Sequence, residues 1–115
     1  MSEAELMRAI QVALCKDRSV RIWRNNCGVL QDVRGNYVGY GLAPGSSDLI
    51  GLKSVTITPD MVGKTVAIFV ALEIKQPRMK LTELQAAFIR VVNGLGGLAG
   101  VARSHEDART VLTGI

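Results

Sequence analysis

The stretch VAIFVALEIKQP, residues 66–77, constrains the fold more than any other part of the sequence. It begins with seven uninterrupted apolar residues and then carries Glu73, Ile74 and Lys75. Such a run predicts a strand over 65–75 with both faces covered, as in the middle of a sheet packed between helices. Side chains alternate along a strand, so Glu73 and Lys75 are expected on one face and Ile74 on the other.

Helical and strand-like patterns lie on both sides of this strand. Residues 2–16 are expected to form a helix, because Ser2 and Glu5 match a capping box and apolar residues such as Leu6 and Ile10 recur at helical spacing. The other expected elements are strands at 20–25, 28–31, 36–40, 48–58 and 98–102 and helices at 82–93 and 104–113. Strands 28–31 and 36–40 would pair as a hairpin, and strands 65–75 and 98–102 would be parallel across a right-handed crossover.

The order α-β-β-β-β-β-α-β-α predicts an α/β domain with one central mixed sheet flanked by helices. A length of 115 residues suits a single domain over residues 1–115, and the formal charge of +4 is compatible with a polyanionic partner. The first residues lack the basic region of a signal peptide, and no apolar stretch reaches the ~20 residues of a membrane span. A cytosolic protein is therefore expected.

The sequence offers few residues for a cysteine- or histidine-based site or for a nucleotide-binding loop. Cys15 and Cys27 form no CxxC or Cys/His cluster, so they are expected to be small buried apolar residues in a reducing compartment. His105 is the one histidine and is expected on the surface. The glycine-rich stretch 94–100 follows a helix rather than a strand, so it indicates the end of that helix and not a nucleotide site.

Asp48 stands directly against an apolar run, as Glu73 does. Each has an ordinary interpretation, because charges at strand ends are usually solvated and loop-end aspartates are common. If their strands are antiparallel neighbours, however, the two carboxylates would meet and would repel each other unless a cation lay between them. Mg²⁺ is bound by one or two such carboxylates together with water and a phosphate oxygen. Lys75 could contact that phosphate or help orient or deprotonate an attacking water, an arrangement that hydrolyses phosphodiesters.

Asp48 followed by Glu73-x-Lys75 resembles the D…(D/E)xK signature of the restriction-endonuclease-like nucleases. That signature alone is weak, but five blocks in order resemble the virus-type replication-repair nuclease (VRR-NUC) domain, and specifically its small stand-alone members carried by bacteriophages and prophages. The blocks are WRNNCG at 23–28, YVGYGLAPGSSDLIG at 37–51, EIKQP at 73–77, LTELQAAFI at 81–89 and GGLAGVARSHEDA at 96–108. One departure is Ser47, which stands before the first acid where the superfamily's name has proline.

The resemblance implies a restriction-endonuclease-like fold and a role for each residue of the signature. Asp48 and Glu73 would bind a divalent metal, Mg²⁺ or Mn²⁺. Ile74 would add its backbone carbonyl as a further metal ligand. Lys75 would be catalytic.

The resemblance also points to residues on two helices. A glutamine in the helix after the signature is often part of the site in this family, and Gln85 fits, although a capping box with Thr82 explains it as well. A glutamate of the first helix commonly completes the site. Glu5 is already explained by its own capping box, and Glu3 lies on the expected inward edge of the helix, so Glu3 is preferred.

The implied function is that of a Mg²⁺- or Mn²⁺-dependent DNA endonuclease, built like the Holliday-junction resolvases and acting as a homodimer on branched DNA. Two alternatives stay open: a nuclease on flapped, nicked or linear duplex DNA, and a non-catalytic DNA-binding module of the same fold. Further residues could contact phosphates, although a solvated surface position is the better interpretation of any one of them. They are Arg24, Asn25, Asn26, Arg78, Lys80 and Arg90.

Overall fold

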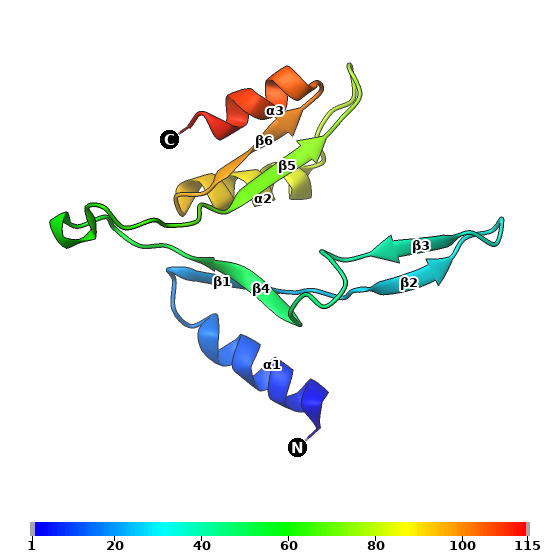
Figure 1. Ribbon diagram of the computed structural model, residues 1–115, viewed down its shortest axis with the longest axis horizontal. Coiled ribbons are helices and arrows are strands. Elements are labelled where there is room, and N and C mark those ends of the chain that lie inside the picture. Colours follow the sequence, from blue (N-terminus) through cyan, green and yellow to red (C-terminus); the bar gives the residue numbers. More distant parts are fainter. Residues whose placement is uncertain (1, 115) are drawn as a thin grey trace. The chain divides into compact units, whose positions relative to one another are not determined.

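The computed structural model describes residues 2–114 (Figure 1). Its elements are α1 (Glu3–Leu14), β1 (Val20–Arg24), β2 (Gly28–Gln31), β3 (Tyr37–Tyr40), β4 (Leu49–Lys53), the 3-10 helix η1 (Pro59–Met61), β5 (Val70–Ile74), α2 (Glu83–Gly94), β6 (Leu98–Ala102) and α3 (His105–Leu112). They fall into two compact units, the first ending at Lys53 and the second beginning at Ser54. The class is mixed α/β, as predicted. None of the helices within residues 2–114 has the length and apolar character needed to cross a membrane.

In the first unit, β1 and β4 form an antiparallel pair, in which Arg24 lies opposite Leu49. The pairing extends one residue beyond both strands, because the backbone N–H of Asn25 donates a hydrogen bond to the carbonyl of Asp48 at 2.8 Å. The end of β1 and the start of β4 are therefore fixed to each other, and Asp48 lies at this junction.

The face of α1 that packs against β1 differs from the predicted one. Leu6 and Ile10 were expected to face inward, but they are 50% and 42% exposed. Met7 and Gln11 are the half-buried positions, and Gln11 Nε2 donates a hydrogen bond to the carbonyl of Ile22 at 3.4 Å. This bond fixes the rotation of the helix, and Met7 shares the face of Gln11 because it lies one turn earlier.

Serine side chains cap two of the helices, although the capping box predicted for Ser2 and Glu5 is only half formed, with no bond from the Glu5 side chain to Ser2 among the described residues. The Ser2 hydroxyl accepts a hydrogen bond from the backbone N–H of Glu5, and the Ser104 hydroxyl accepts one from the backbone N–H of Asp107, both at 3.1 Å. Each cap satisfies a backbone donor that has no partner within its own helix. The helices therefore begin where the sequence indicates.

The predicted hairpin is confirmed as the antiparallel pair β2 and β3. A single aspartate organises its turn, since Asp32 Oδ1 accepts hydrogen bonds from the backbone N–H groups of Arg34 and Asn36, at 2.9 and 2.8 Å. Gly35 follows with a φ of 84°, a conformation that glycine adopts without strain. This local chemistry explains why the hairpin could be predicted from sequence.

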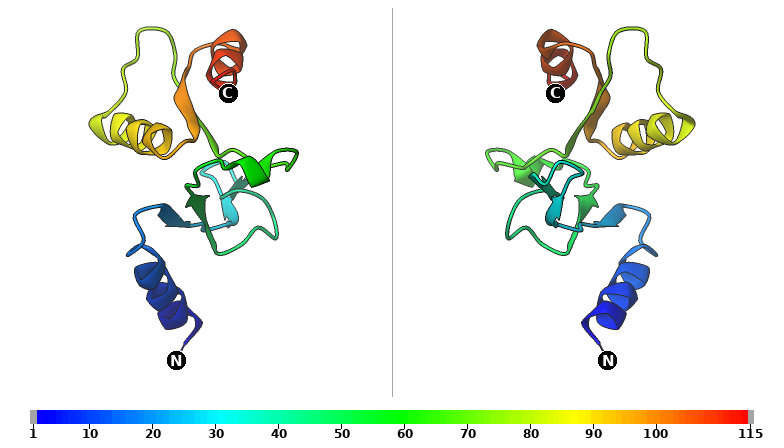
Figure 2. Two further views of the ribbon diagram at one scale, coloured as in Figure 1. Left: turned by 90° about the vertical axis from the view of Figure 1, so that its left-hand side faces the viewer. Right: turned by 90° about the vertical axis from the view of Figure 1, so that its right-hand side faces the viewer.

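In the second unit, β5 and β6 are parallel, as predicted, with Ile74 opposite Ala102. The two helices of this unit lie on opposite faces of the strand pair (Figure 2). Glu73 lies on the face covered by α2, because it lines a pocket with residues of that helix. Gly100 lies on the other face, against Val111 of α3.

The C-terminal end of α2 is tied to β6. Val92 is completely buried, and the Asn93 side chain both donates to the carbonyl of Ala99 and accepts from its N–H, at 3.0 and 2.8 Å. Gly97 allows this close packing, because a methyl group there would overlap the Val92 side chain. The helix is thereby held along β5 and β6, and its first turn lies near the C-terminal end of β5 (Figure 1).

The apolar run does not form the covered central strand that its composition predicts. β5 begins only at Val70, and the side chains of Val66 and Val70 are 49% and 41% exposed. The strand is short because its partner β6 has five residues, and the ladder cannot extend beyond it. Instead of one central sheet, the described residues form three two-stranded sheets, and the strand predicted at 48–58 is limited to β4.

Candidate active site

The C-terminal end of β5 carries two charged side chains on one face, as strand alternation predicts. Lys75 Nζ lies 3.9 Å from Glu73 Oε1. The lysine side chain is only 17% exposed and the glutamate side chain 35% exposed. Lysine is rarely so buried, so an ammonium held beside a carboxylate at the edge of a packed face is a candidate for chemistry rather than an ordinary surface charge.

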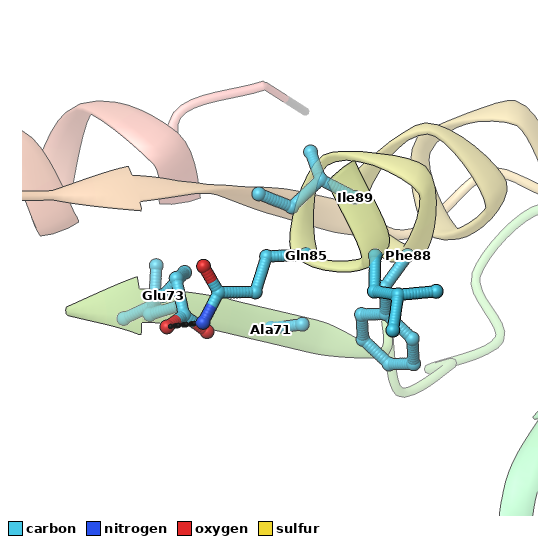
Figure 3. A pocket seen from close by; sticks show the side chains of 7 residues that line it. Ala71, Glu73, Gln85, Phe88 and Ile89 are labelled. Atoms are coloured by element: carbon cyan, nitrogen blue, oxygen red, sulfur yellow. Dashed lines mark hydrogen bonds between the residues drawn. The ribbon is translucent and has the colours of Figure 1, made fainter. Parts of the chain in front are cut away.

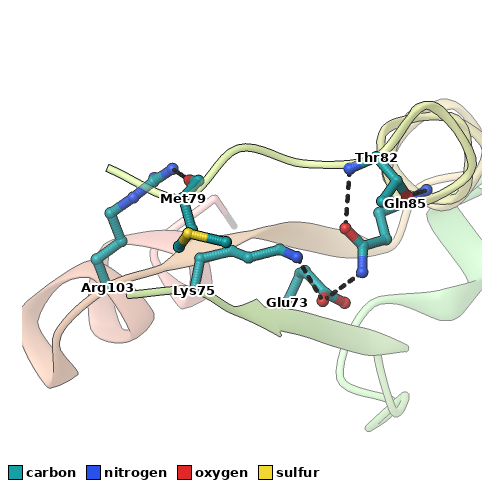
Figure 4. Close-up of polar contacts among 6 residues, drawn as sticks. All are labelled: Glu73, Lys75, Met79, Thr82, Gln85 and Arg103. Carbon is teal, nitrogen blue, oxygen red and sulfur yellow. Dashed lines mark hydrogen bonds and ion pairs between the residues drawn. The ribbon is translucent and has the colours of Figure 1, made fainter. Parts of the chain in front are cut away.

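Gln85 joins this pair to the first turn of α2 (Figure 4). Its Nε2 donates a hydrogen bond to Glu73 Oε1 at 2.9 Å, while its Oε1 accepts one from the backbone N–H of Thr82, also at 2.9 Å. The Thr82 hydroxyl accepts from the backbone N–H of Gln85 at 3.1 Å, which completes the predicted capping box. Gln85 therefore does both: it completes the helix cap with Thr82, and it donates a hydrogen bond to Glu73.

A pocket of about 350 Å³ opens beside Glu73, between β5 and α2 (Figure 3). Its walls are mostly apolar, and Glu73 and Gln85 supply the polar groups at one end. The lining residues are Ala71, Leu72, Glu73, Leu84, Gln85, Phe88 and Ile89. The carboxylate thus lies at the border between an apolar surface and solvent.

The backbone of β5 directs one carbonyl away from its partner strand. The N–H of Lys75 donates to the carbonyl of Ala102 on β6 at 3.2 Å. Alternate residues of a parallel strand bond to the same neighbour, so the carbonyl of Ile74 faces the opposite edge. Within residues 2–114 no strand pairs with β5 at that edge. The Ile74 carbonyl is therefore open to a ligand beside Glu73, a condition that its expected role requires.

The segment between β5 and α2 is held by Arg103, which lies in the turn between β6 and α3. Arg103 Nη2 donates a hydrogen bond to the carbonyl of Met79 at 2.7 Å (Figure 4). Arg78 has a φ of 78°, the one positive value outside glycine among the described residues. A left-handed arginine is strained, and the bond to Met79 helps to hold the segment in this conformation.

Asp48 belongs to the first unit and is surrounded differently. Its side chain is exposed, and its carboxylate has no hydrogen bond or ion pair within the described part of the chain. Its position is set through the backbone by Asn25, which bonds to the carbonyl of Asp48 and, through Nδ2, to the carbonyl of Ser47 at 2.9 Å.

Cys27 lies against the loop that precedes Asp48. Its sulfur is 3.0 Å from Ser46 Oγ, and hydrogen bonding from Ser46, together with backbone N–H groups of the loop, lowers the pKa of the Cys27 thiol. Gly41 permits this approach, because it has a φ of 85° and a methyl group there would collide with the Cys27 sulfur. The prediction that both cysteines are buried among apolar residues is therefore wrong, because Cys27 is half-buried among polar groups and Cys15 is exposed.

The two candidate glutamates of α1 are both exposed. Glu3 lies four residues before Met7, in line with the face that contacts β1, whereas Glu5 points to another side of the helix. A short turn joins α1 to β1 and Gln11 bonds to Ile22, so the two elements run antiparallel. Glu3 therefore extends toward the same end of the first unit as the end of β1.

The oxygen donors at the end of β5 suit a hard divalent cation. Glu73 offers a carboxylate and Ile74 a carbonyl, the ligand types that Mg²⁺ and Mn²⁺ prefer. Within residues 2–114, no three His, Cys, Asp or Glu side chains are grouped so that they could hold a metal ion. Other ligands of an ion bound at β5 would have to come from a further acid, from water or from a substrate.

These features define a mixed α/β protein with a carboxylate, an ammonium and an amide gathered at one strand end. A model of the VRR-NUC domain family matches residues 4–106, nearly the whole chain of 115 residues. The protein belongs to this family of nucleases, which places it among hydrolases that act on DNA and usually use divalent metals. No curated protein and no solved structure was found to match it.

Sequence reasoning missed the structural roles of three residues, Arg103 in the second unit and Ser46 and Asn25 in the first. Arg103 and Ser46 act through hydrogen bonds to segments distant in the sequence, and Asn25 was interpreted as a possible phosphate contact. The signal that could have indicated Asn25 is an amide directly after a strand, since asparagine often bonds to the backbone of a neighbouring loop. The loop in question could not be identified without knowing which strands pair.

Proposed function

We propose that the protein is a divalent-metal-dependent endonuclease that hydrolyses phosphodiester bonds in branched DNA, as Holliday-junction resolvases do. The observation that carries the proposal is the cluster at the end of β5, where the Glu73 carboxylate accepts a hydrogen bond from Gln85 and lies beside the Lys75 ammonium. In a family of nucleases, these groups have the chemistry that phosphodiester hydrolysis requires.

In this proposal, Asp48, Glu73 and the carbonyl of Ile74 hold Mg²⁺ or Mn²⁺. The bound ion supplies Lewis acidity toward the phosphate and toward water. Lys75 stabilises the negative charge that develops on the phosphate oxygens, and its low exposure strengthens that interaction.

Two residues support the acids. Gln85 keeps the Glu73 carboxylate in one orientation through its 2.9 Å hydrogen bond. Glu3 completes the set from α1, and its alignment with Met7 supports Glu3 rather than Glu5 in this role. The restriction-endonuclease-like fold is part of the same proposal.

We also propose that two copies act together. A four-way junction must be cut at two symmetry-related positions, and a two-fold homodimer supplies two equivalent sites. The support is the resemblance to stand-alone VRR-NUC proteins. The same resemblance supports a phage or prophage origin and a cytoplasmic location in a bacterial host.

The test uses a labelled four-way junction and a linear duplex of the same sequence. Each is incubated with the protein in Mg²⁺, in Mn²⁺ and in EDTA, together with Lys75→Ala and the control Lys64→Ala. Lys64 is an exposed lysine outside the cluster. Symmetric nicking of the junction that requires metal, persists in Lys64→Ala and is lost in Lys75→Ala is the expected result. Sedimentation of the protein with and without the junction measures whether it is a dimer.

Two other results would change the proposal. Equal metal-dependent cutting of junction and linear duplex would retain the nuclease and remove the preference for branched DNA. Binding of either substrate without any cutting, unaffected by Lys75→Ala, would instead indicate a non-catalytic DNA-binding module.

A further inference from the structure

One side chain holds the loop that leads to Asp48. The loop spans residues 42–47, and Asn25 contacts it from the end of β1. Leu42 N–H donates to Asn25 Oδ1 at 3.2 Å, and Asn25 Nδ2 donates to Ser46 Oγ at 2.8 Å and to the carbonyl of Ser47 at 2.9 Å. The amide therefore bonds to both ends of the loop, and both of its hydrogens are used.

Ser46 closes the same loop from within. Its hydroxyl donates to the carbonyl of Ala43 at 2.7 Å and accepts from the N–H of Ala43 at 3.3 Å. Ser46 is half-buried, in contrast to the exposed residues on either side of it. Asn25 and Ser46 together form one hydrogen-bonded unit that fixes the path of the backbone.

This unit ends at Asp48. The main-chain N–H of Asn25 donates to the carbonyl of Asp48, and its side chain donates to the carbonyl of the preceding residue, Ser47. Two consecutive carbonyls are thus bonded to one residue. The Asp48 carboxylate has no partner of its own among the described residues, so the backbone that Asn25 holds sets the position from which this side chain reaches a ligand.

We propose that Asn25 is a positioning residue for Asp48: by holding the backbone of residues 47 and 48, it places this carboxylate where it can bind the divalent metal. The inference rests on the proposed function and deepens it. It replaces the earlier expectation that Asn25 contacts a phosphate, because both amide hydrogens are already donated within the loop. Residues that orient a metal ligand in this way commonly contribute 10–100-fold, as an order of magnitude, to metal affinity or activity.

The test compares Asn25→Ala with Asn36→Ala, a substitution in the hairpin turn of the same unit, where the side chain makes no hydrogen bond within residues 2–114. Ser46→Ala and Ser47→Ala form a second, milder pair, in which only the first removes a hydrogen bond. Mn²⁺ binding is measured by electron paramagnetic resonance without DNA, and cleavage of the junction is measured over a range of Mn²⁺ concentrations. Thermal unfolding shows what fraction of each variant is folded.

We expect Asn25→Ala to bind Mn²⁺ at least about tenfold more weakly. DNA cleavage by this variant should require correspondingly more Mn²⁺. At a saturating Mn²⁺ concentration, its cleavage rate should return most of the way to the wild-type rate. Ser46→Ala should show the same shift to a smaller degree, and the two controls should match the wild type. A purely structural role would reduce the folded fraction and the maximal rate without changing the Mn²⁺ concentration at half-saturation.

The outcomes separate the two proposals. In one outcome, the wild type binds Mn²⁺ and cuts DNA, and the folded Asn25→Ala and Ser46→Ala variants reach half-saturation at the same Mn²⁺ concentration as the wild type. The positioning role of Asn25 would then be wrong, and the proposed nuclease function would be retained. If the wild type neither binds Mn²⁺ nor cuts, the proposed function fails and the role of Asn25 falls with it.

Discussion

Glu73 and Asp48 both stand at strand ends, but the protein holds them by different means. Glu73 is fixed through its side chain, by Gln85 at 2.9 Å and by the nearby Lys75 ammonium. Asp48 is fixed through its backbone, and its carboxylate is exposed. The acid of the second unit is therefore oriented before any ligand arrives, whereas the acid of the first unit depends on the loop that carries it.

Neutralising either acid tests whether both matter for the same reaction. Glu73→Gln and Asp48→Asn are each expected to lower cleavage by at least about 100-fold, because each removes a charge that is proposed to stabilise the metal and the transition state. Glutamine at position 73 retains an oxygen that accepts from Gln85, so folding should be unaffected. Single-turnover cleavage and thermal unfolding measure the two effects.

A difference between the two acids would be informative. If Asp48→Asn cleaves at the wild-type rate while Glu73→Gln is inactive, the metal is held without Asp48 and the first unit contributes no ligand at this position. The two variants thus test whether Asp48 and Glu73 of the D…(D/E)xK signature take part in the same reaction.

The side-chain contact of Glu73 can be separated from the helix cap. Gln85→Ala and Thr82→Ala both remove capping-box bonds, and each should lower the free energy of unfolding by about 1 kcal/mol. Only Gln85→Ala also removes the hydrogen bond to Glu73, so only this variant should lose cleavage activity, by about tenfold. Equal activity of the two variants would show that Gln85 serves the helix alone.

The smallest expected effect concerns the loop of the first unit. In a Cys15→Ser background, alkylation of Cys27 by iodoacetamide should follow the thiolate population. Ser46→Ala should move the midpoint of the pH profile upward, because it removes the hydroxyl that can turn from the Ala43 carbonyl to donate to the Cys27 thiolate, the main cause that lowers the pKa of Cys27. An unchanged midpoint would mean that Ser46 does not hold the loop against Cys27 in solution.

Local chemistry made much of the second unit predictable. The capping box of Thr82 and Gln85 marks the start of α2, and strand alternation places Glu73 and Lys75 on one face, as the structure has them. The Asp32 turn likewise marks the hairpin. In each case the relevant residues lie within a few positions of one another, so the pattern contains the interaction.

Predictions that depended on distant partners were less accurate. The apolar run before Glu73 indicates a long covered strand, but the length of β5 is limited by its partner β6. The face of α1 is determined by the bond from Gln11 to Ile22, which hydrophobic spacing does not show. The role proposed for Asn25 could not be predicted for the same reason, because its partners lie 17 to 22 residues away.

The two hydrogen bonds of the Gln85 amide have a dynamic consequence. One end of the amide accepts from Thr82 and the other donates to Glu73, so a rotation of the side chain breaks both bonds together. First turns of helices fray readily, and here each such opening also releases the carboxylate to water. The orientation of Glu73 and the closure of the first turn of α2 are therefore coupled through one side chain.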